Sequence, residues 1–117
     1  MDILINNGGV SQRDVFEKSE MKILYHLMNV NTLSPIALIK GFMPKWLKQE
    51  GGAQIVNILS VAGQLGVPQR SFYSATKFAL DGFGKAISAE LADRNISVLQ
   101  CYPAYVKTNI SKNAMVG

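Results

Sequence analysis

Cysteine and histidine are scarce in this sequence of 117 residues, which has one of each, Cys101 and His26. A disulfide needs two thiols, and a zinc site or an iron–sulfur cluster needs several thiolate or imidazole ligands. The sequence therefore excludes disulfide scaffolds, zinc fingers and iron–sulfur sites within the chain, and we expect no metal. We expect Cys101 to be a small buried residue of a strand, and His26 to be a structural residue on the apolar face of a helix.

Charged residues are also few, at 17%, whereas hydrophobic residues make up 48% and the net charge is only +4. Disordered chains combine low hydrophobicity with high net charge, so we expect a globular protein. The positive residues are scattered, and Lys40, Lys45 and Lys48 are typical of a solvated helix end rather than of a phosphate-binding patch. No nucleic-acid partner is therefore expected.

Long hydrophobic runs are missing. The uncharged stretch over residues 23–39 contains too many polar side chains to span a membrane, and the apolar run at residues 3–5 is too short for a signal peptide. We therefore expect a soluble chain without a membrane segment, cytoplasmic or, with an upstream anchor, membrane-associated.

Three short apolar runs alternate with two long helical segments. The runs cover residues 3–5, 53–59 and 96–102. Because they are apolar nearly throughout, they indicate strands of a parallel sheet that is covered on both faces. Helices are predicted over residues 19–49 and 72–94, and Pro35 predicts an irregularity in the first of them near residues 31–35. This order of elements is that of right-handed crossovers, so we predict an α/β fold.

The second predicted helix carries small residues along one face. They are Ala75, Ala79, Gly82, Ala86 and Ala89. Small side chains permit a close approach of the helix, either to the protein's own sheet or to a partner helix, and both alternatives are open.

Tyr73 and Lys77 are four residues apart at the start of the second helix and therefore share one face. A nearby ammonium ion favours a phenolate, which allows a tyrosine to donate and accept a proton. Ser60 follows the second strand, at the end where open parallel sheets place their ligands. Its hydroxyl can donate a hydrogen bond to a carbonyl oxygen that Tyr73 protonates. These residues predict a site that polarises and protonates one substrate oxygen.

The same residues resemble the catalytic tetrad of the short-chain dehydrogenase/reductase family. Ser60 matches the family's serine, Tyr73 and Lys77 match its Tyr-x-x-x-Lys pair, and Asn31 matches its helix asparagine. The resemblance implies that Ser60 holds the substrate carbonyl and that Tyr73 is the general acid and base. It also implies that Lys77 stabilises the phenolate and binds the nicotinamide ribose, and that Asn31 fixes a water in the proton relay.

Three further segments carry the resemblance. Residues 6–9, Asn-Asn-Gly-Gly, are similar to the family's Asn-Asn-Ala-Gly turn, and residues 102–108 resemble the segment that meets the nicotinamide. Residues 6–13 look most like the branch that contains dehydrogenase/reductase member 7. The cofactor contacts that the resemblance implies are Asn6, Gly8, Tyr73, Lys77, Pro103, Val106 and Thr108. The implied function is an NAD(P)-dependent oxidoreductase that interconverts a small-molecule carbonyl and a primary or secondary alcohol by hydride transfer, with NADP or NAD as cofactor.

The sequence departs from the family pattern at both ends and at two motif positions. No glycine-rich phosphate-binding turn precedes residue 3, and the sequence stops soon after Thr108. We therefore expect residues 1–117 to be a partial catalytic domain, a Rossmann-like doubly wound sheet without its amino-terminal half. Gly8 in place of alanine should leave its turn intact, whereas Ala104 in place of glycine would be strained if that position needs a positive φ.

Two functions follow from this incompleteness. The chain is either part of an enzyme whose complete form binds NADP or NAD, or a truncated, catalytically inactive homologue that acts as a dimerisation module. In either case we expect a homo-oligomer that forms through the two long helices. We expect the isolated chain to bind no NADPH, because half of the cofactor site is absent.

Overall fold

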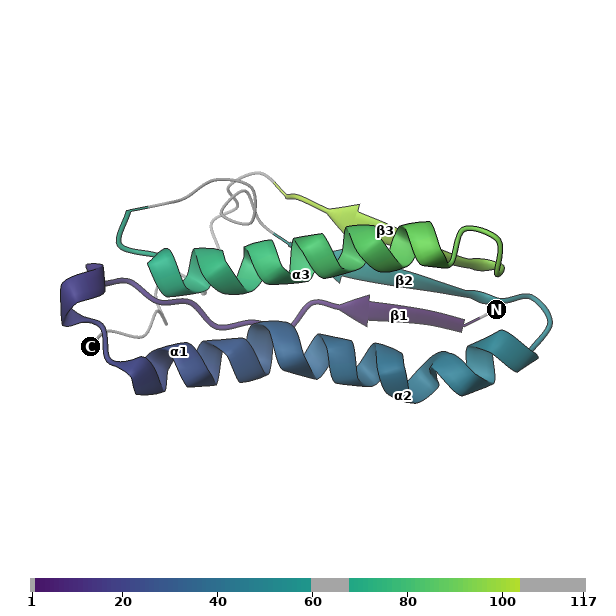
Figure 1. Cartoon of the computed structure of the whole chain (residues 1–117), viewed down its shortest axis with the longest axis horizontal. Helices are drawn as coiled ribbons and strands as arrows, with labels where there is room; N and C mark the ends of the chain where they lie inside the picture. Colours follow the sequence, from purple (N-terminus) through teal and green to yellow (C-terminus); the bar gives the residue numbers. More distant parts are fainter. Residues whose placement is uncertain (1, 60–67, 104–117) are drawn as a thin grey trace.

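The fold is a three-stranded parallel sheet with helices along one face (Figure 1). The computed structural model describes residues 2–59 and 68–103. The strands are β1 (Asp2–Asn6), β2 (Ala53–Ile58) and β3 (Ile96–Cys101), and they lie in the order β1-β2-β3. Both neighbouring pairs are parallel, which confirms the predicted α/β arrangement.

One nearly continuous helix connects β1 to β2, and a second connects β2 to β3. The first consists of α1 (Met21–Met28), the π-helical turn η2 (Asn29–Leu33) and α2 (Ser34–Lys48), preceded by a single 3-10 turn, η1 (Phe16–Lys18). The second is α3 (Ser71–Glu90). Among the described residues, no helix is both long and apolar enough to cross a lipid bilayer.

The predicted irregularity in the first helix is confirmed and takes the form of a π turn. The N–H of Ser34 donates to the carbonyl of Asn29, five residues back, and the Ser34 hydroxyl donates to the same oxygen at 2.7 Å. Pro35 has no N–H to continue the regular pattern, which favours the wider turn. The turn buries the polar side chains of Asn31 and Thr32.

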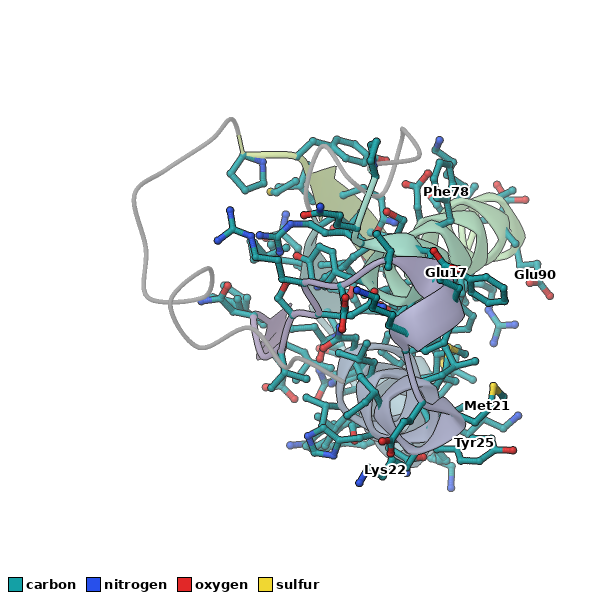
Figure 2. The ribbon with its side chains drawn as sticks, turned by 90° about the vertical axis from the view of Figure 1, so that its left-hand side faces the viewer. Glu17, Met21, Lys22, Tyr25, Phe78 and Glu90 are labelled. Atoms are coloured by element: carbon teal, nitrogen blue, oxygen red, sulfur yellow. The ribbon has the colours of Figure 1, made fainter. Side chains whose placement is uncertain are left out.

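Helices cover only one face of the described sheet, so the expectation of cover on both faces is not met there. Both crossovers step in the same direction across the sheet, and right-handed connections then place their helices on the same side. Figure 2 shows α2 and α3 on the same side of the strands. On the other face Ile3 and Ile5 are 61% and 60% exposed. The covered face holds the main core cluster, which consists of Ile39, Trp46, Ala53, Ile55, Leu91 and Ile96.

The small-residue stripe of α3 faces outward, so it does not pack on the described sheet. Its five members are all exposed. The side of α3 that approaches the sheet instead carries Leu80 and Gly84, both buried. A Cβ added to Gly84 would lie 2.2 Å from the side-chain nitrogen of Gln100 on β3, whereas a Cβ on Gly82 would meet no atom within 4 Å. A side chain at position 84 would therefore force the Gln100 side chain to move, whereas one at position 82 would displace nothing.

This contrast predicts opposite effects of the same substitution two residues apart. Gly82→Ala should raise the free energy of unfolding by about 0.5–1 kcal/mol, because alanine is the better helix former. Gly84→Ala should lower it by about 1–3 kcal/mol, because the methyl group displaces Gln100. Urea unfolding of the two variants measures both effects, and equal gains in stability would show that α3 does not approach β3 as closely as described.

Candidate active site at the carboxyl edge of the sheet

The candidate residues gather where the three parallel strands end. α3 begins at this edge, so Tyr73 and Lys77 lie in its first two turns, and both side chains are buried. The π turn brings Asn31 to the same place, and the Asn31 side chain contacts α3. Of the predicted site residues, Ser60, Val106 and Thr108, together with Ala104, lie outside the described residues.

Asn31 joins three segments through its buried side-chain amide. Its Oδ1 accepts the N–H of Val10 at 2.9 Å, and its Nδ2 donates to the carbonyl of Val10 at 2.8 Å and to Oγ1 of Thr76 at 3.1 Å. The Thr76 hydroxyl in turn donates to the carbonyl of Tyr73 at 2.7 Å. The loop after β1 and the π turn are thereby fixed to the part of α3 that lies between Tyr73 and Lys77.

Lys77 is a buried cation. The residue is only 4% exposed, and its Nζ lies 5.8 Å from the centre of the Tyr73 ring. The π-electrons of the ring attract the ammonium ion, but burial still lowers the pKa of Lys77 from its ordinary value. Within residues 2–59 and 68–103, no carboxylate forms an ion pair with it.

The glycine turn after β1 adjoins this ammonium. A Cβ on Gly9 would lie 3.5 Å from Nζ of Lys77, an ordinary contact, and 3.2 Å from Oδ1 of Asn31, so any other residue there would crowd the Asn31 amide. A Cβ on Gly8 would meet no atom within 4 Å, so glycine and alanine both fit at that position. Gly9, which the sequence analysis did not single out, is therefore the glycine that adjoins the site.

A ladder of amide side chains ties the strand ends together beneath the site. Nδ2 of Asn6 donates to Oδ1 of Asn57 at 2.8 Å, and Nδ2 of Asn57 donates to Oε1 of Gln100 at 2.7 Å. The ladder continues at 3.4 Å to the carbonyl of Asp81 on α3. The side chain of Asn6, a predicted cofactor contact, thus forms a hydrogen bond that links β1 to β2.

The end of β3 is attached to α3 by a second polar contact. The hydroxyl of Tyr102 donates to Oδ1 of Asp81, and Nζ of Lys85 lies 2.9 Å from Oδ2 of the same carboxylate. Burial alone would raise the pKa of Asp81, but the hydrogen bonds from Tyr102 and Lys85 outweigh it and lower that pKa. Pro103, another predicted cofactor contact, follows directly and is exposed.

Two residues lie where the sequence did not predict them. His26 is exposed on α1, so its expected place on the apolar face is wrong. Gln12, which no motif pointed to, is fully buried beside the start of α3. Cys101 lies on β3 as expected, but it is only half-buried.

The short chain dehydrogenase family model matches residues 1–116. The chain belongs to this family. Among curated proteins it is 39% identical over its whole length to dehydrogenase/reductase SDR family protein 7-like from Drosophila melanogaster and to dehydrogenase/reductase SDR family member 7B from Xenopus tropicalis. The chain covers 36% and 38% of the length of these two relatives.

Solved structures of the same family share its fold. A short-chain dehydrogenase/reductase from Burkholderia phymatum in complex with NAD matches 97% of the chain with a TM-score of 0.91 and 28% identity. A gluconate 5-dehydrogenase from Burkholderia cenocepacia in complex with NADP and tartrate matches 96% with a TM-score of 0.89 and 28% identity. The chain covers 41% and 44% of these structures.

The buried charge of Lys77 predicts a pH-dependent gain in stability when it is removed. Lys77→Met should raise the free energy of unfolding at neutral pH by on the order of 1 kcal/mol, because a buried ammonium without a carboxylate partner is costly. Since burial lowers the pKa of Lys77 in the folded state, the unfolded state binds more protons between that pKa and 10.5. The advantage of the variant should therefore shrink as the pH rises towards 10.5.

Urea unfolding of parent and variant at a series of pH values measures this difference. A variant that is less stable than the parent at neutral pH would show instead that the fold stabilises the ammonium ion.

Proposed function

We propose that this chain supplies the proton-transfer site of an NAD(P)-dependent oxidoreductase that interconverts a carbonyl and an alcohol. The observation that carries the proposal is the buried Lys77 ammonium, which lies near the Tyr73 ring and beside the glycine turn at Gly9. Family membership and the NAD or NADP bound to similar structures support the same conclusion.

The residues present fit a nicotinamide coenzyme. A buried ammonium without a carboxylate partner among the described residues can donate hydrogen bonds to ribose hydroxyls, which carry no charge and need no counter-ion. Gly9 has no side chain to stand between such a group and Lys77. Lys77 and the backbone at the glycine turn would therefore hold the nicotinamide ribose.

A nicotinamide coenzyme held there would supply the hydride for the carbonyl carbon in the reduction direction, and the electron pair of the C=O bond would move to oxygen. The Tyr73 hydroxyl gives its proton to that oxygen, and the Lys77 ammonium stabilises the phenolate that remains. Ser60, assigned by its motif, donates a hydrogen bond to the same oxygen. In the oxidation direction Tyr73 takes the proton back.

The side chain of Asn31 contributes to this site by holding the loop after β1 against α3, and not by binding a water or the substrate. Within residues 2–59 and 68–103, its three side-chain hydrogen bonds go to Val10 and Thr76. A water in the proton relay would therefore bind the main-chain carbonyl of Asn31, which lacks the usual donor four residues on because that residue is Pro35.

The role of Tyr73 is tested in a chimera in which residues 1–117 replace the matching 36% of the Drosophila relative. Tyr73→Phe should lower kcat for carbonyl reduction by at least about a hundredfold, since the proton donor is lost, while coenzyme binding and the circular dichroism spectrum remain. The consumption of NADPH or NADH with a panel of ketones and aldehydes measures kcat. The intact relative is the control that shows whether the panel contains a substrate. Unchanged turnover would show that Tyr73 is not the acid.

We further propose that the chain forms a homo-oligomer through the outer face of its helices. This face, here called the outer helix face, comprises Met21 and Tyr25 on α1 and Phe78 with the small-residue stripe on α3. Met21 is 51%, Tyr25 63% and Phe78 43% exposed, and Figure 2 shows Met21 and Tyr25 pointing outward, away from the sheet. Large exposed apolar surfaces next to small residues are typical of helix–helix interfaces.

A charge placed in the stripe tests the interface. Ala79→Glu should reduce the molar mass in solution to that of a monomer, because it buries an unpaired carboxylate between the subunits. Light scattering after size-exclusion chromatography measures the mass. Arg94→Glu, an exposed change beyond the end of α3, is the matched control and should leave it unchanged. A monomeric parent would contradict the proposal, and so would an unchanged mass for Ala79→Glu.

A further inference from the structure

Gln12 is a fully buried polar residue in the loop between β1 and α1. Its exposed fraction is 0%, although it lies outside the helices and the three strands, at an isolated β-bridge. Its side-chain amide forms two hydrogen bonds: Nε2 donates to Oγ of Ser19 at 2.7 Å, and Oε1 accepts the backbone N–H of Phe72 at 2.9 Å. The second bond joins residues sixty positions apart.

This second bond caps the start of α3. The first N–H groups of a helix have no partner within the helix, and a side chain at the N-cap position usually accepts from one of them. The N-cap residue of α3 is Arg70, whose side chain makes no such bond. Gln12 supplies the missing acceptor from a distant loop, at the residue that directly precedes Tyr73.

Further contacts fix the loop against the helix start. The guanidinium of Arg70 donates to the hydroxyl of Ser11 and, at 3.4 Å, to the carbonyl of Gln12. The N–H of Asp14 donates to the carbonyl of Gln69 at 2.9 Å. The Arg70 side chain has no acceptor with which to cap the helix. It instead donates hydrogen bonds to the loop that carries the capping residue Gln12.

We propose that Gln12 is a positioning residue for the acid Tyr73, an inference that rests on the proposed function. The first turn of α3 begins with the bond from the Ser74 N–H to the carbonyl of Arg70 at 2.7 Å, and Tyr73 lies inside this turn. Without Gln12 the Phe72 N–H would be buried and unpaired, and the turn would open to reach another acceptor. The Tyr73 hydroxyl would then lose its fixed place relative to the substrate oxygen.

The proposal separates Gln12 from the rest of the site. Lys77 lies one turn further along α3, beyond Thr76, which Asn31 holds independently. Loss of the Gln12 cap should therefore disturb proton transfer but not the binding of the coenzyme ribose. This split distinguishes a positioning role from general stabilisation, which would affect both.

The test uses the chimera with the Drosophila relative and three variants. Gln12→Ala should lower kcat by about tenfold or more, while the Kd of the coenzyme changes by less than about threefold. Gln12→Glu keeps the acceptor oxygen for the Phe72 N–H but replaces the donor to Ser19 with a buried carboxylate oxygen, so kcat should lie between that of Gln12→Ala and that of the parent. Gln49→Ala removes a comparable bond, from Nε2 to the carbonyl of Gly52 at the opposite edge of the sheet, and should leave kcat unchanged.

Hydrogen exchange of the backbone amides supplies a readout that does not depend on activity. In Gln12→Ala the amides of Phe72 and Tyr73 should exchange faster, whereas those of β2 should not. An unchanged kcat in Gln12→Ala would overturn the proposal, and so would faster exchange throughout β2, which indicates general destabilisation. If the parent chimera is inactive while the intact relative turns over, the proposed function fails. The rate of amide hydrogen exchange at Phe72 in Gln12→Ala then still decides whether Gln12 stabilises the first turn of α3.

Discussion

The side-chain amide of Asn31 is the joint on which the candidate site depends. It is completely buried, and it forms direct hydrogen bonds with both backbone groups of Val10 and with the hydroxyl of Thr76. The position of this side chain depends on the π-helical geometry of the turn. The π turn that precedes Pro35 places it between the loop after β1 and the middle of α3. One local departure from helical geometry thereby fixes two segments that are far apart in sequence.

Burying the charge of Lys77 costs free energy, and no carboxylate among the described residues compensates for it. Among the described residues its ammonium lies near an aromatic ring but near no carboxylate, and a buried charge without a carboxylate partner is costly and typical of a functional site. On the function proposed above, a neutral, hydroxylated group that binds beside Gly9 would be the partner of this charge. Stability and function would then make opposite demands on residue 77.

The sequence predicted what depends on local pattern. Strand runs, helix lengths and the shared face of Tyr73 and Lys77 follow from periodicity, and Pro35 predicted the irregular turn within two residues. Periodicity shows which residues share a helix face but not which face meets the sheet. The small-residue stripe was therefore left between two alternatives, and His26 was assigned to the wrong environment.

Contacts between distant segments could not be predicted from the sequence. Gln12 lies in a loop without periodicity, and its partner Phe72 is sixty residues away, so no local signal marks it. The same holds for Gly84, whose need for glycine arises from Gln100 on another strand. For the contact of Gly9 with Asn31 and Lys77, the sequence did contain a signal. Two consecutive glycines in the Asn-Asn-Gly-Gly turn indicate a close approach of the backbone to another group.

An experimental structure of the chimera with bound NADP or NAD tests the central claim most directly, namely that the partner of the Lys77 ammonium is the coenzyme. The account predicts hydrogen bonds from Lys77 Nζ to the hydroxyls of the nicotinamide ribose, with the Tyr73 hydroxyl beside the nicotinamide ring. A structure in which Lys77 instead pairs with a carboxylate of the protein, and the nicotinamide lies away from Tyr73, would contradict it.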